Sequence, residues 1–265
     1  KESDLFGIWF HEFLGSIDQT ILRPGTDCLK DQTDNLCKDP KGNINFSVAG
    51  HAPHTSSPKM LQRLKQESKS RGLVFSIHVA ESDDESEFIT SAKGDWALFL
   101  KERNIDFSSW PVPARSEVEY LDKLGLFDAQ TIAVHLLNCD SSDFEIIAKR
   151  GAKPVLSPRS NLNLHGKLPD LPKMLAMGLK PGLGTDSLAS CDSLSIFDEM
   201  AFVAKKFPGV DPGTVFAMAT INGAEAIGME KIAGTLEPGK TGDFLYLPLE
   251  TYNLEGFLKK VTSYE

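Results

Sequence analysis

The chain has 265 residues, of which 41% are hydrophobic and 25% charged, and its formal net charge is -9 at pH 7. Its length allows one large α/β domain or two small ones, and its composition is that of an ordinary globular chain. The acidic balance argues against binding to a phosphate backbone, so we expect no nucleic-acid partner. We find neither an apolar run that could span a bilayer nor a signal peptide, and we expect a cytoplasmic protein with no membrane partner.

Strand-like and helix-like segments alternate along most of the chain. Short runs of apolar, β-branched or aromatic residues predict six strands, at 7–13, 43–48, 73–79, 131–136, 153–156 and 180–184. Most of these runs are apolar throughout, which is typical of parallel strands that are buried on both faces. Helix signals separate them: Ser57 followed by Pro58 predicts a helix start, and Gly125, Gly151 and Gly178 follow three later helical segments.

This alternation predicts a parallel sheet with right-handed crossovers. A closed (β/α)8 barrel needs eight strands, and six are found. Either two strands come from sequence outside this chain, or the sheet is open and doubly wound. Residues 19–43 are polar and predict a long loop, whereas residues 232–249 are strand-like and punctuated by glycine and proline. We therefore divide the chain at residue 230, into domains 1–230 and 231–265.

The four cysteines are far apart and include no Cys-x-x-Cys pair. Such spacing is poor material for a disulfide framework or a structural zinc site. A bridge between Cys28 and Cys37 is one alternative, and free thiols in a reducing cytoplasm are the other, which we prefer.

Side chains that bind metals or move protons follow the last four predicted strands. In chain order they are His78 with Glu81, His135, Arg159 with Asn161, and Asp186 with Ser187. Because parallel strands end at one edge of a sheet, we expect these side chains to face one site. Histidines and carboxylates at such an edge are typical of metal-assisted hydrolysis, in which a bound water needs a proton acceptor beside it.

The strand-end residues also have structural interpretations. His78 and His135 could be core histidines satisfied by hydrogen bonds, and Glu81 could be an acid at a helix start. Asp186 could cap the next helix.

Three further polar residues could either contact a ligand or play a purely structural role. His51, in the Gly/Pro-fixed loop after the second strand, could contact a ligand or belong to a surface loop. Arg159 and Asn161 could hydrogen-bond a substrate or tie loops together, and we favour the second role.

Taken together, the motifs resemble the amidohydrolase superfamily, in the branch with cytosine deaminase, guanine deaminase, adenosine-type nucleoside deaminases and atrazine chlorohydrolase. Residues 223–243 are similar to that family's return from its barrel into a small β domain, and the resemblance covers nearly the whole chain. The motifs that carry it are His51-Ala52-Pro53, His78-Val79-Ala80-Glu81, His135, Pro158-Arg159-Ser160-Asn161 and Gly184-Thr185-Asp186-Ser187. Arg159-Ser160-Asn161 and 185–190 most resemble the aminofutalosine and S-adenosylhomocysteine/methylthioadenosine deaminases.

The fold that the resemblance implies is α/β: a (β/α)8 TIM-like barrel lacking its first strands, with the start of a small β domain at the C-terminus. The family's first barrel strand carries His-x-His, two metal ligands, and no His-x-His occurs here. By pattern, residues 7–13 match the third barrel strand. We therefore expect an N-terminally truncated piece of an enzyme, inactive by itself.

The resemblance also implies roles in catalysis. His78 would be a metal ligand, and Asp186 both a metal ligand and the general base. Glu81 would shuttle a proton, and His135 would orient the water and polarise the attacked carbon.

The resemblance assigns other residues to substrate binding. They are His51, Arg159, Asn161 and Ser187. Two departures are mild: Ser157 stands where many relatives have cysteine, and His54 where an aromatic residue is common.

The implied function is that of a metal-dependent deaminase that releases ammonia from a purine-type nucleoside or related N-heterocycle, such as aminofutalosine, S-adenosylhomocysteine or methylthioadenosine. The metal would be divalent, zinc by preference, with iron or manganese as alternatives. A hydrolytic dechlorinase, a cyclic amidohydrolase or a metal-free binding relative are the competing interpretations. The partner is a small molecule, and exposed strand edges would favour a homo-oligomer.

Overall fold

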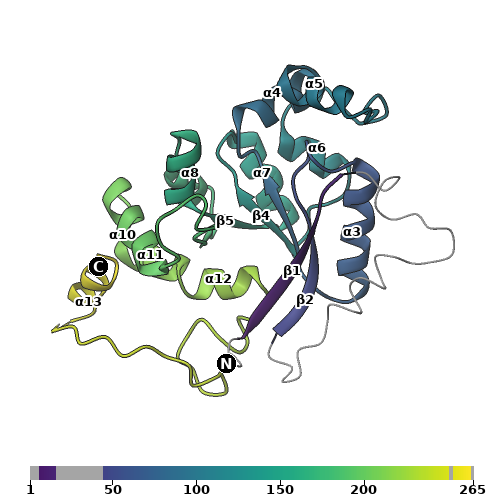
Figure 1. Ribbon diagram of the computed structural model, residues 1–265. Helices are drawn as coiled ribbons and strands as arrows, with labels where there is room; N and C mark the ends of the chain where they lie inside the picture. The colour runs from purple at the N-terminus through teal and green to yellow at the C-terminus, as the bar shows by residue number, and fades with distance from the viewer. Residues whose placement is uncertain (1–5, 16–43, 251–252, 264–265) are drawn as a thin grey trace. The chain divides into compact units, whose positions relative to one another are not determined.

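The computed structural model describes residues 6–15, 44–250 and 253–263, and shows an α/β chain (Figure 1). All six predicted strands are confirmed, although the last is shorter than expected. Their hydrogen-bonded order follows the chain: β1 (Gly7–Phe13), β2 (Ile44–Gly50), β3 (Phe75–Val79), β4 (Thr131–His135), β5 (Lys153–Leu156) and β6 (Gly182–Leu183). Each printed pairing is parallel. The predicted loop at 19–43 and the Cys28–Cys37 alternative lie outside the described residues.

The chain divides into two compact units. The first comprises Lys1–Ala133 and Arg150–Ala152, and the second Val134–Lys149 and Lys153–Glu265. Strand β4 begins in the first unit and ends in the second. The boundary predicted at residue 230 stays a prediction.

In the first unit, β1 pairs with β2 along its whole length, from Gly7↔Ile44 to Phe13↔Gly50, and β2 continues to β3. Helix α3 (Pro58–Ser70) connects β2 to β3 and packs on β2. It begins as predicted, because the Ser57 hydroxyl accepts the Met60 N–H at 3.3 Å and proline follows the cap.

The buried face of α3 explains one glycine of β2. Met60, Leu61 and Leu64 are fully buried. A Cβ on Gly50 would lie 2.4 Å from Cδ2 of Leu61, so the strand accepts the helix only where it has no side chain.

Three helices lie between β3 and β4: α4 (Asp83–Ser91), α5 (Gly94–Glu102) and α6 (Glu117–Lys123). Helix α6 begins after Ser116, whose hydroxyl caps it by accepting the Glu119 N–H at 3.1 Å. The acidic run that opens α4 suits its positive N-terminal end. Phe88 and Ile89 of α4 are fully buried, so this layer shares the unit's apolar core.

In the second unit, β5 pairs with β6 through Val155↔Gly182 and Leu156↔Leu183. The helices of this unit are α7 (Ser141–Arg150, whose last residue belongs to the first unit), α8 (Pro158–His165), α9 (Leu171–Ala176), α10 (Ile196–Lys206), α11 (Pro212–Met218), α12 (Ile221–Ala226) and α13 (Leu254–Val261). Helix α12 packs on β5 and β6. A Cβ on Gly182 would lie 3.3 Å from the Gly223 Cα, so two glycines permit this close approach.

The C-terminal stretch differs from the expectation. The described residues 231–250 contain no strand, and α13 follows them. The Phe216 and Phe257 rings, 5.9 Å apart, join α11 to α13. The glycines and prolines of this stretch lie in turns and irregular segments. A strand would need a neighbouring strand, which the described residues of this stretch do not supply.

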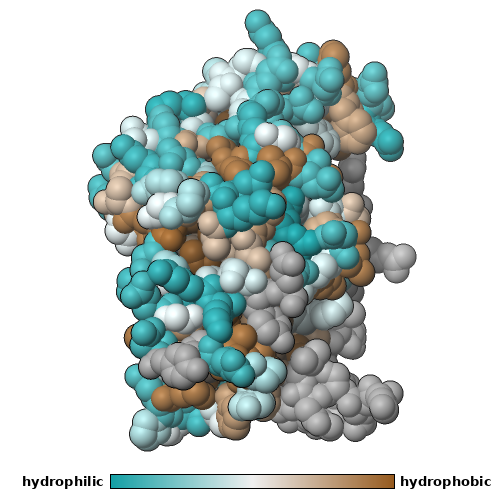
Figure 2. All heavy atoms as spheres, turned by 90° about the vertical axis from the view of Figure 1, so that its left-hand side faces the viewer, coloured by the Kyte–Doolittle hydropathy of each residue, from teal (hydrophilic) through white to brown (hydrophobic). Residues whose placement is uncertain are grey.

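On the face shown in Figure 2, hydrophilic side chains predominate and hydrophobic ones form separate patches. Among the described helices, none has the length and apolar character needed to cross a bilayer.

A buried ion pair joins α3 to the start of β4. Lys65 is only 5% exposed, and its ammonium donates to Asp128 Oδ1 at 2.6 Å and to Thr131 Oγ1 at 2.8 Å. Removing the carboxylate would leave a buried cation with one neutral partner.

We expect Asp128→Ala to lower the free energy of unfolding by roughly 2–3 kcal/mol, because it strands the Lys65 charge. Asp122→Ala, which breaks the exposed pair with Arg150, is the matched control and should cost less than about 1 kcal/mol. Urea denaturation followed by circular dichroism measures both. Equal losses in the two variants would show that the Lys65 pair does not hold α3 in place.

Candidate active site

Left-handed backbone conformations mark the ends of three strands. Ala80 follows β3 with φ 54°, His135 and Leu136 end β4 with φ 77° and 56°, and Asp186 follows β6 with φ 59°. Such conformations cost a non-glycine residue about 1–3 kcal/mol and cluster at functional sites. Two of these four residues, His135 and Asp186, were predicted site residues, and a third adjoins Glu81.

Backbone hydrogen bonds align the strand ends of the first unit. The His51 N–H donates to the Phe13 carbonyl at 3.0 Å, and the His78 N–H donates to the His51 carbonyl at 2.9 Å. As a result the His51 and His78 ring centroids lie 5.3 Å apart. The structure thus brings two of the predicted residues together.

Glu12 completes this group and was missed by the sequence analysis. Its Oε1 lies 3.3 Å from His78 Nε2, and ligand atoms of Glu12, His51 and His78 all lie within 4.8 Å of one another. The only available signal was an acid one residue from the end of an apolar strand. The hydrogen bond from His78 lowers the pKa of Glu12, so the carboxylate is charged at neutral pH.

The same group fits a divalent metal. Two imidazoles and a carboxylate are the donor types that zinc prefers. Burial, followed by the neighbouring His78, lowers the pKa of His51, which favours the neutral, ligating form of that ring. His51 Nδ1 is held by the Thr55 hydroxyl at 2.6 Å.

Glu81 lies between the Ala80 turn and helix α4. The N-cap of α4 is Ser82, whose hydroxyl accepts the Glu85 N–H at 3.2 Å. Glu81 therefore precedes the helix and is not its capping residue, and its side chain is partly exposed.

In the second unit, His135 and Asn161 form a buried pair. They are 1% and 0% exposed, and Asn161 Nδ2 lies 2.8 Å from His135 Nδ1. An amide nitrogen only donates, so Nδ1 accepts and the neutral ring carries its proton on Nε2. Asn161 thus has a structural role, holding the His135 ring, and this role is compatible with a catalytic role for His135.

Asp186 is exposed and accepts a hydrogen bond from Ser160 Oγ at 2.5 Å through Oδ2. It does not cap the next helix, because Ser195 caps α10. Ser187 is also exposed, and its hydroxyl accepts the Ala189 N–H at 3.2 Å. Both side chains are accessible to a small molecule.

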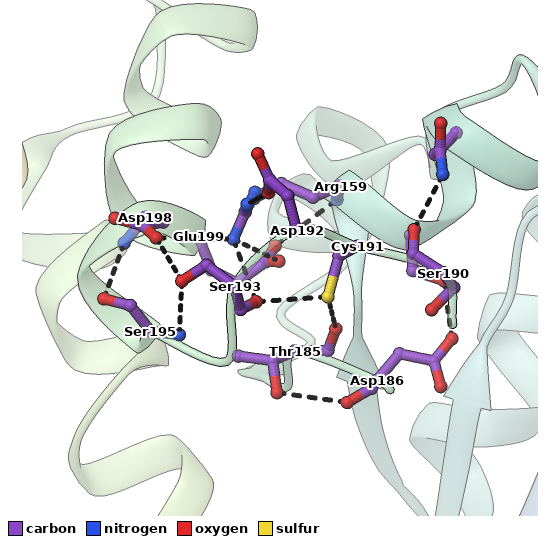
Figure 3. Close-up of polar contacts among 12 residues, drawn as sticks. Arg159, Thr185, Asp186, Ser190, Cys191, Asp192, Ser193, Ser195, Asp198 and Glu199 are labelled. Atoms are coloured by element: carbon purple, nitrogen blue, oxygen red, sulfur yellow. Dashed lines mark hydrogen bonds and ion pairs between the residues drawn. The ribbon is translucent and has the colours of Figure 1, made fainter. Parts of the chain in front are cut away.

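Arg159 ties together the segments around α8 and α10 (Figure 3). Its guanidinium donates to Asp192 and to the Ser193 carbonyl, and lies 3.8 Å from Glu199 Oε1. The Glu199 carboxylate also accepts the Arg159 N–H at 3.3 Å. Burial raises the pKa of Glu199 to about 7, although the Arg159 N–H and guanidinium oppose the rise. These contacts support the loop-tying role of Arg159, and its substrate-binding role stays a prediction.

Helix α8 is a feature that the sequence analysis did not predict. It begins at Pro158, directly after β5, and carries Ser160 and Asn161 on its first turn, where both are buried. The missed signal was Ser157 followed by Pro158, the same pair that correctly predicted the start of α3.

Consecutive parallel strands with imidazoles and carboxylates at or just after their ends are typical of metal-assisted hydrolases of the barrel class. The model of the amidohydrolase family matches residues 25–262, and the chain belongs to this family. The resemblance seen in the sequence, and the fold class inferred from it, are confirmed.

Three similar proteins illustrate this membership. The chain is 31% identical over 251 residues to 5-methylthioadenosine/S-adenosylhomocysteine deaminase of Caldanaerobacter subterraneus subsp. tengcongensis, covering 91% of this chain and 53% of that protein. It is 25% identical to the crystal structure of Helicobacter pylori aminofutalosine deaminase, with a TM-score of 0.82 over 99% of this chain and 65% of that one. It is also 25% identical to an adenosine deaminase from Xanthomonas campestris solved with bound zinc, with a TM-score of 0.63 over 80% and 45%. The chain spans about half the length of the curated relatives it matches.

His54, where relatives commonly have an aromatic residue, is 6% exposed and lies against Trp96, with ring centroids 4.4 Å apart. Burial, reinforced by His51 and His78, lowers the pKa of His54 to about 3. Its ring is therefore neutral in the folded protein at any pH above about 4.

We expect the His54 ring resonances to stay constant between pH 8 and pH 4.5 in a two-dimensional NMR titration. The unfolded chain binds a proton at His54 near pH 6.5 and the folded chain does not, so stability from this residue is present above pH 6.5 and is lost as the pH falls. In His54→Phe, the free energy of unfolding should fall less steeply below pH 6.5, by up to about 1.4 kcal/mol per pH unit. A His54 resonance that titrates near pH 6.5 would contradict its burial.

Proposed function

We propose that the protein carrying this chain is a hydrolytic deaminase that replaces the amino group of an adenosine-type nucleoside with oxygen and releases ammonia. The observation that carries the proposal is the set of imidazoles and carboxylates in the strand-end turns of a chain that belongs to the amidohydrolase family. The three similar proteins described above are named as deaminases of adenine nucleosides or aminofutalosine, and these names support the substrate class.

The metal in this proposal is divalent, with zinc preferred. His78 and Asp186 would hold it, and the clustering of His78 with His51 and Glu12 supports a metal-binding environment in the first unit. When bound, such an ion supplies a Lewis acid that makes water acidic enough to lose a proton near neutral pH.

The chain's own residues then move the protons. Asp186 accepts a proton from the attacking water, and its accessible carboxylate suits that task. Glu81 delivers a proton to the ring nitrogen beside the attacked carbon. His135 orients the water through the proton that its bond to Asn161 leaves on Nε2. The amino group departs as ammonia, so one water is consumed for each ammonia released.

Substrate contacts are assigned on the same basis. His51, Asn161, Ser187 and Arg159 are the proposed contacts, with His51 reaching the sugar. We further propose a methylthioadenosine, S-adenosylhomocysteine or aminofutalosine-like substrate, because similar curated proteins carry those names. Ammonia release from a panel of such nucleosides by the native protein tests the proposal, and a chlorinated triazine in the panel tests for dechlorination instead.

Asp186→Asn and Glu81→Gln should each lower kcat by about 10²–10⁴-fold, because each removes a proton acceptor or donor. The measurement is ammonia release by the native protein and its variants under saturating nucleoside. Asp84→Asn, an exposed acid three residues beyond Glu81, is the matched control and should retain wild-type turnover. Wild-type turnover in Asp186→Asn would exclude the proposed role of that residue as general base.

Asn161→Ala should lower kcat by about 10-fold or more, because the His135 ring loses the donor that fixes its proton on Nε2, and any rise in KM would report the loss of the proposed substrate contact. Steady-state kinetics measures the split, and ¹⁵N chemical shifts of the ring identify the tautomer. The control is Asn163→Ala. Asn163 lies on the same helix as Asn161, and its loss removes only a hydrogen bond to the Ser190 carbonyl. An unchanged tautomer together with unchanged kcat would show that Asn161 does not act through His135.

A further inference from the structure

The inference concerns Glu85, a carboxylate on the first turn of α4 that the proposed reaction does not use. Glu85 is 0% exposed. Its Oε1 accepts the Ala80 N–H at 3.0 Å, and its Oε2 accepts the Glu81 N–H at 2.9 Å. Both oxygens of one buried side chain are thus bonded to consecutive backbone amides of the turn that presents Glu81.

An acid at this helix position is usually a capping residue. In a capping box, the carboxylate three residues after the N-cap accepts the backbone N–H of the cap itself, here Ser82. Glu85 instead reaches past Ser82 to the two preceding residues. Its bonds therefore fix the turn before the helix.

That turn needs an external partner. Ala80 has φ 54°, a conformation that alanine adopts at a cost of about 1–3 kcal/mol and keeps only when its surroundings impose it. Two hydrogen bonds from one carboxylate supply such a constraint. The direction of the Glu81 side chain follows from the backbone at Ala80 and Glu81.

The surroundings of Glu85 keep water away from its carboxylate and leave it bonded to the turn. Burial, followed by the charge of Glu117, raises its pKa, while the two backbone N–H groups of Ala80 and Glu81 oppose that rise. His54 Nδ1 lies 3.9 Å from Oε2, and Trp96 packs against the His54 ring.

We propose that Glu85 is a positioning residue for Glu81: it holds the turn through both amides so that the Glu81 carboxylate reaches the substrate nitrogen. The proposal rests on the proposed function for the role of Glu81, while its structural part concerns the turn alone. Glu85 itself touches neither substrate nor metal in this account.

The chain provides a matched control. Ser116 and Glu119 open α6 with the same Ser-x-x-Glu spacing, and Glu119 Oε2 accepts the Arg115 N–H at 2.8 Å. Only one Glu119 oxygen takes a backbone N–H, so the carbonyl of a glutamine can replace it. Glu85→Gln, in contrast, turns an NH₂ group toward one of two N–H donors and must lose a bond.

The first experiment measures steady-state kinetics of the native protein in a double-mutant cycle. Glu85→Gln should lower kcat by about 10-fold or more with KM changed by less than about 3-fold, and should add less than about 2-fold in the Glu81→Gln background. Glu119→Gln should leave kcat unchanged. Ser82→Ala, which removes the α4 cap but keeps Glu85, should also retain kcat, because helix capping is not the role proposed. An additive loss in the double variant, or an equal loss in Ser82→Ala, would overturn the proposal.

The second experiment does not depend on the reaction. Amide hydrogen exchange at Ala80 and Glu81 should accelerate at least about 10-fold in Glu85→Gln and stay unchanged in Glu119→Gln. Unchanged exchange at both amides would refute the holding role, whatever the enzyme's substrate. Faster exchange without any nucleoside deamination by the wild-type protein would instead place the failure in the proposed function. If Glu85→Gln does not fold, Glu85→Asp, whose shorter chain reaches only one of the amides, takes its place in both experiments.

Discussion

Each candidate site residue lies near the end of a short parallel strand or just after it, where the backbone turns away from its strand partners. Buried amides that lack a partner are costly, so such turns need side chains that accept or donate hydrogen bonds. In the first unit, Glu85 accepts the two amides after β3. In the second, the Gly184 N–H after β6 bonds to the Leu156 carbonyl, and Ser160 donates to the Asp186 carboxylate. The reactive side chains lie where these turns are fixed.

The two units use different electrostatics to keep this arrangement. In the first, imidazoles dominate: burial keeps His51 and His54 neutral, while Glu12 stays charged beside His78. In the second, Arg159 neutralises a group of acids that includes the buried Glu199. The first arrangement suits metal ligands, which must be deprotonated to bind. The Arg159 cluster suits a structural role, because its guanidinium is already paired with acids.

Sequence patterns predicted the strands and the start of α3 because these depend on local signals. An apolar run predicts a buried strand, and a serine before proline predicts a helix start, as at Ser57. The same signal at Ser157 was overlooked because the motif that follows it drew a functional interpretation. The strand-like stretch at 232–249 shows the opposite limit, since strand formation depends on a partner that local sequence does not reveal.

The candidate site was predictable where residue type and strand-end position coincide, as for His78, His135 and Asp186. Glu12 and Glu85 were not, because their importance comes from what they contact: His78 Nε2 in one case and two backbone amides in the other. The pairing of Asn161 with His135, 26 residues apart in the sequence, likewise depends on the fold.

The central proposal is that the imidazoles and carboxylates near the strand ends serve metal-assisted hydrolysis, with His78 and Asp186 as metal ligands. Anomalous X-ray diffraction from crystals of the native protein, recorded at the zinc edge, tests it most directly. The account predicts one ion per chain bonded to His78 Nε2 and to an Asp186 oxygen, at about 2.0–2.2 Å. An ion bound elsewhere, with neither His78 nor Asp186 as a ligand and the His78 ring still paired to Glu12, would contradict the proposal.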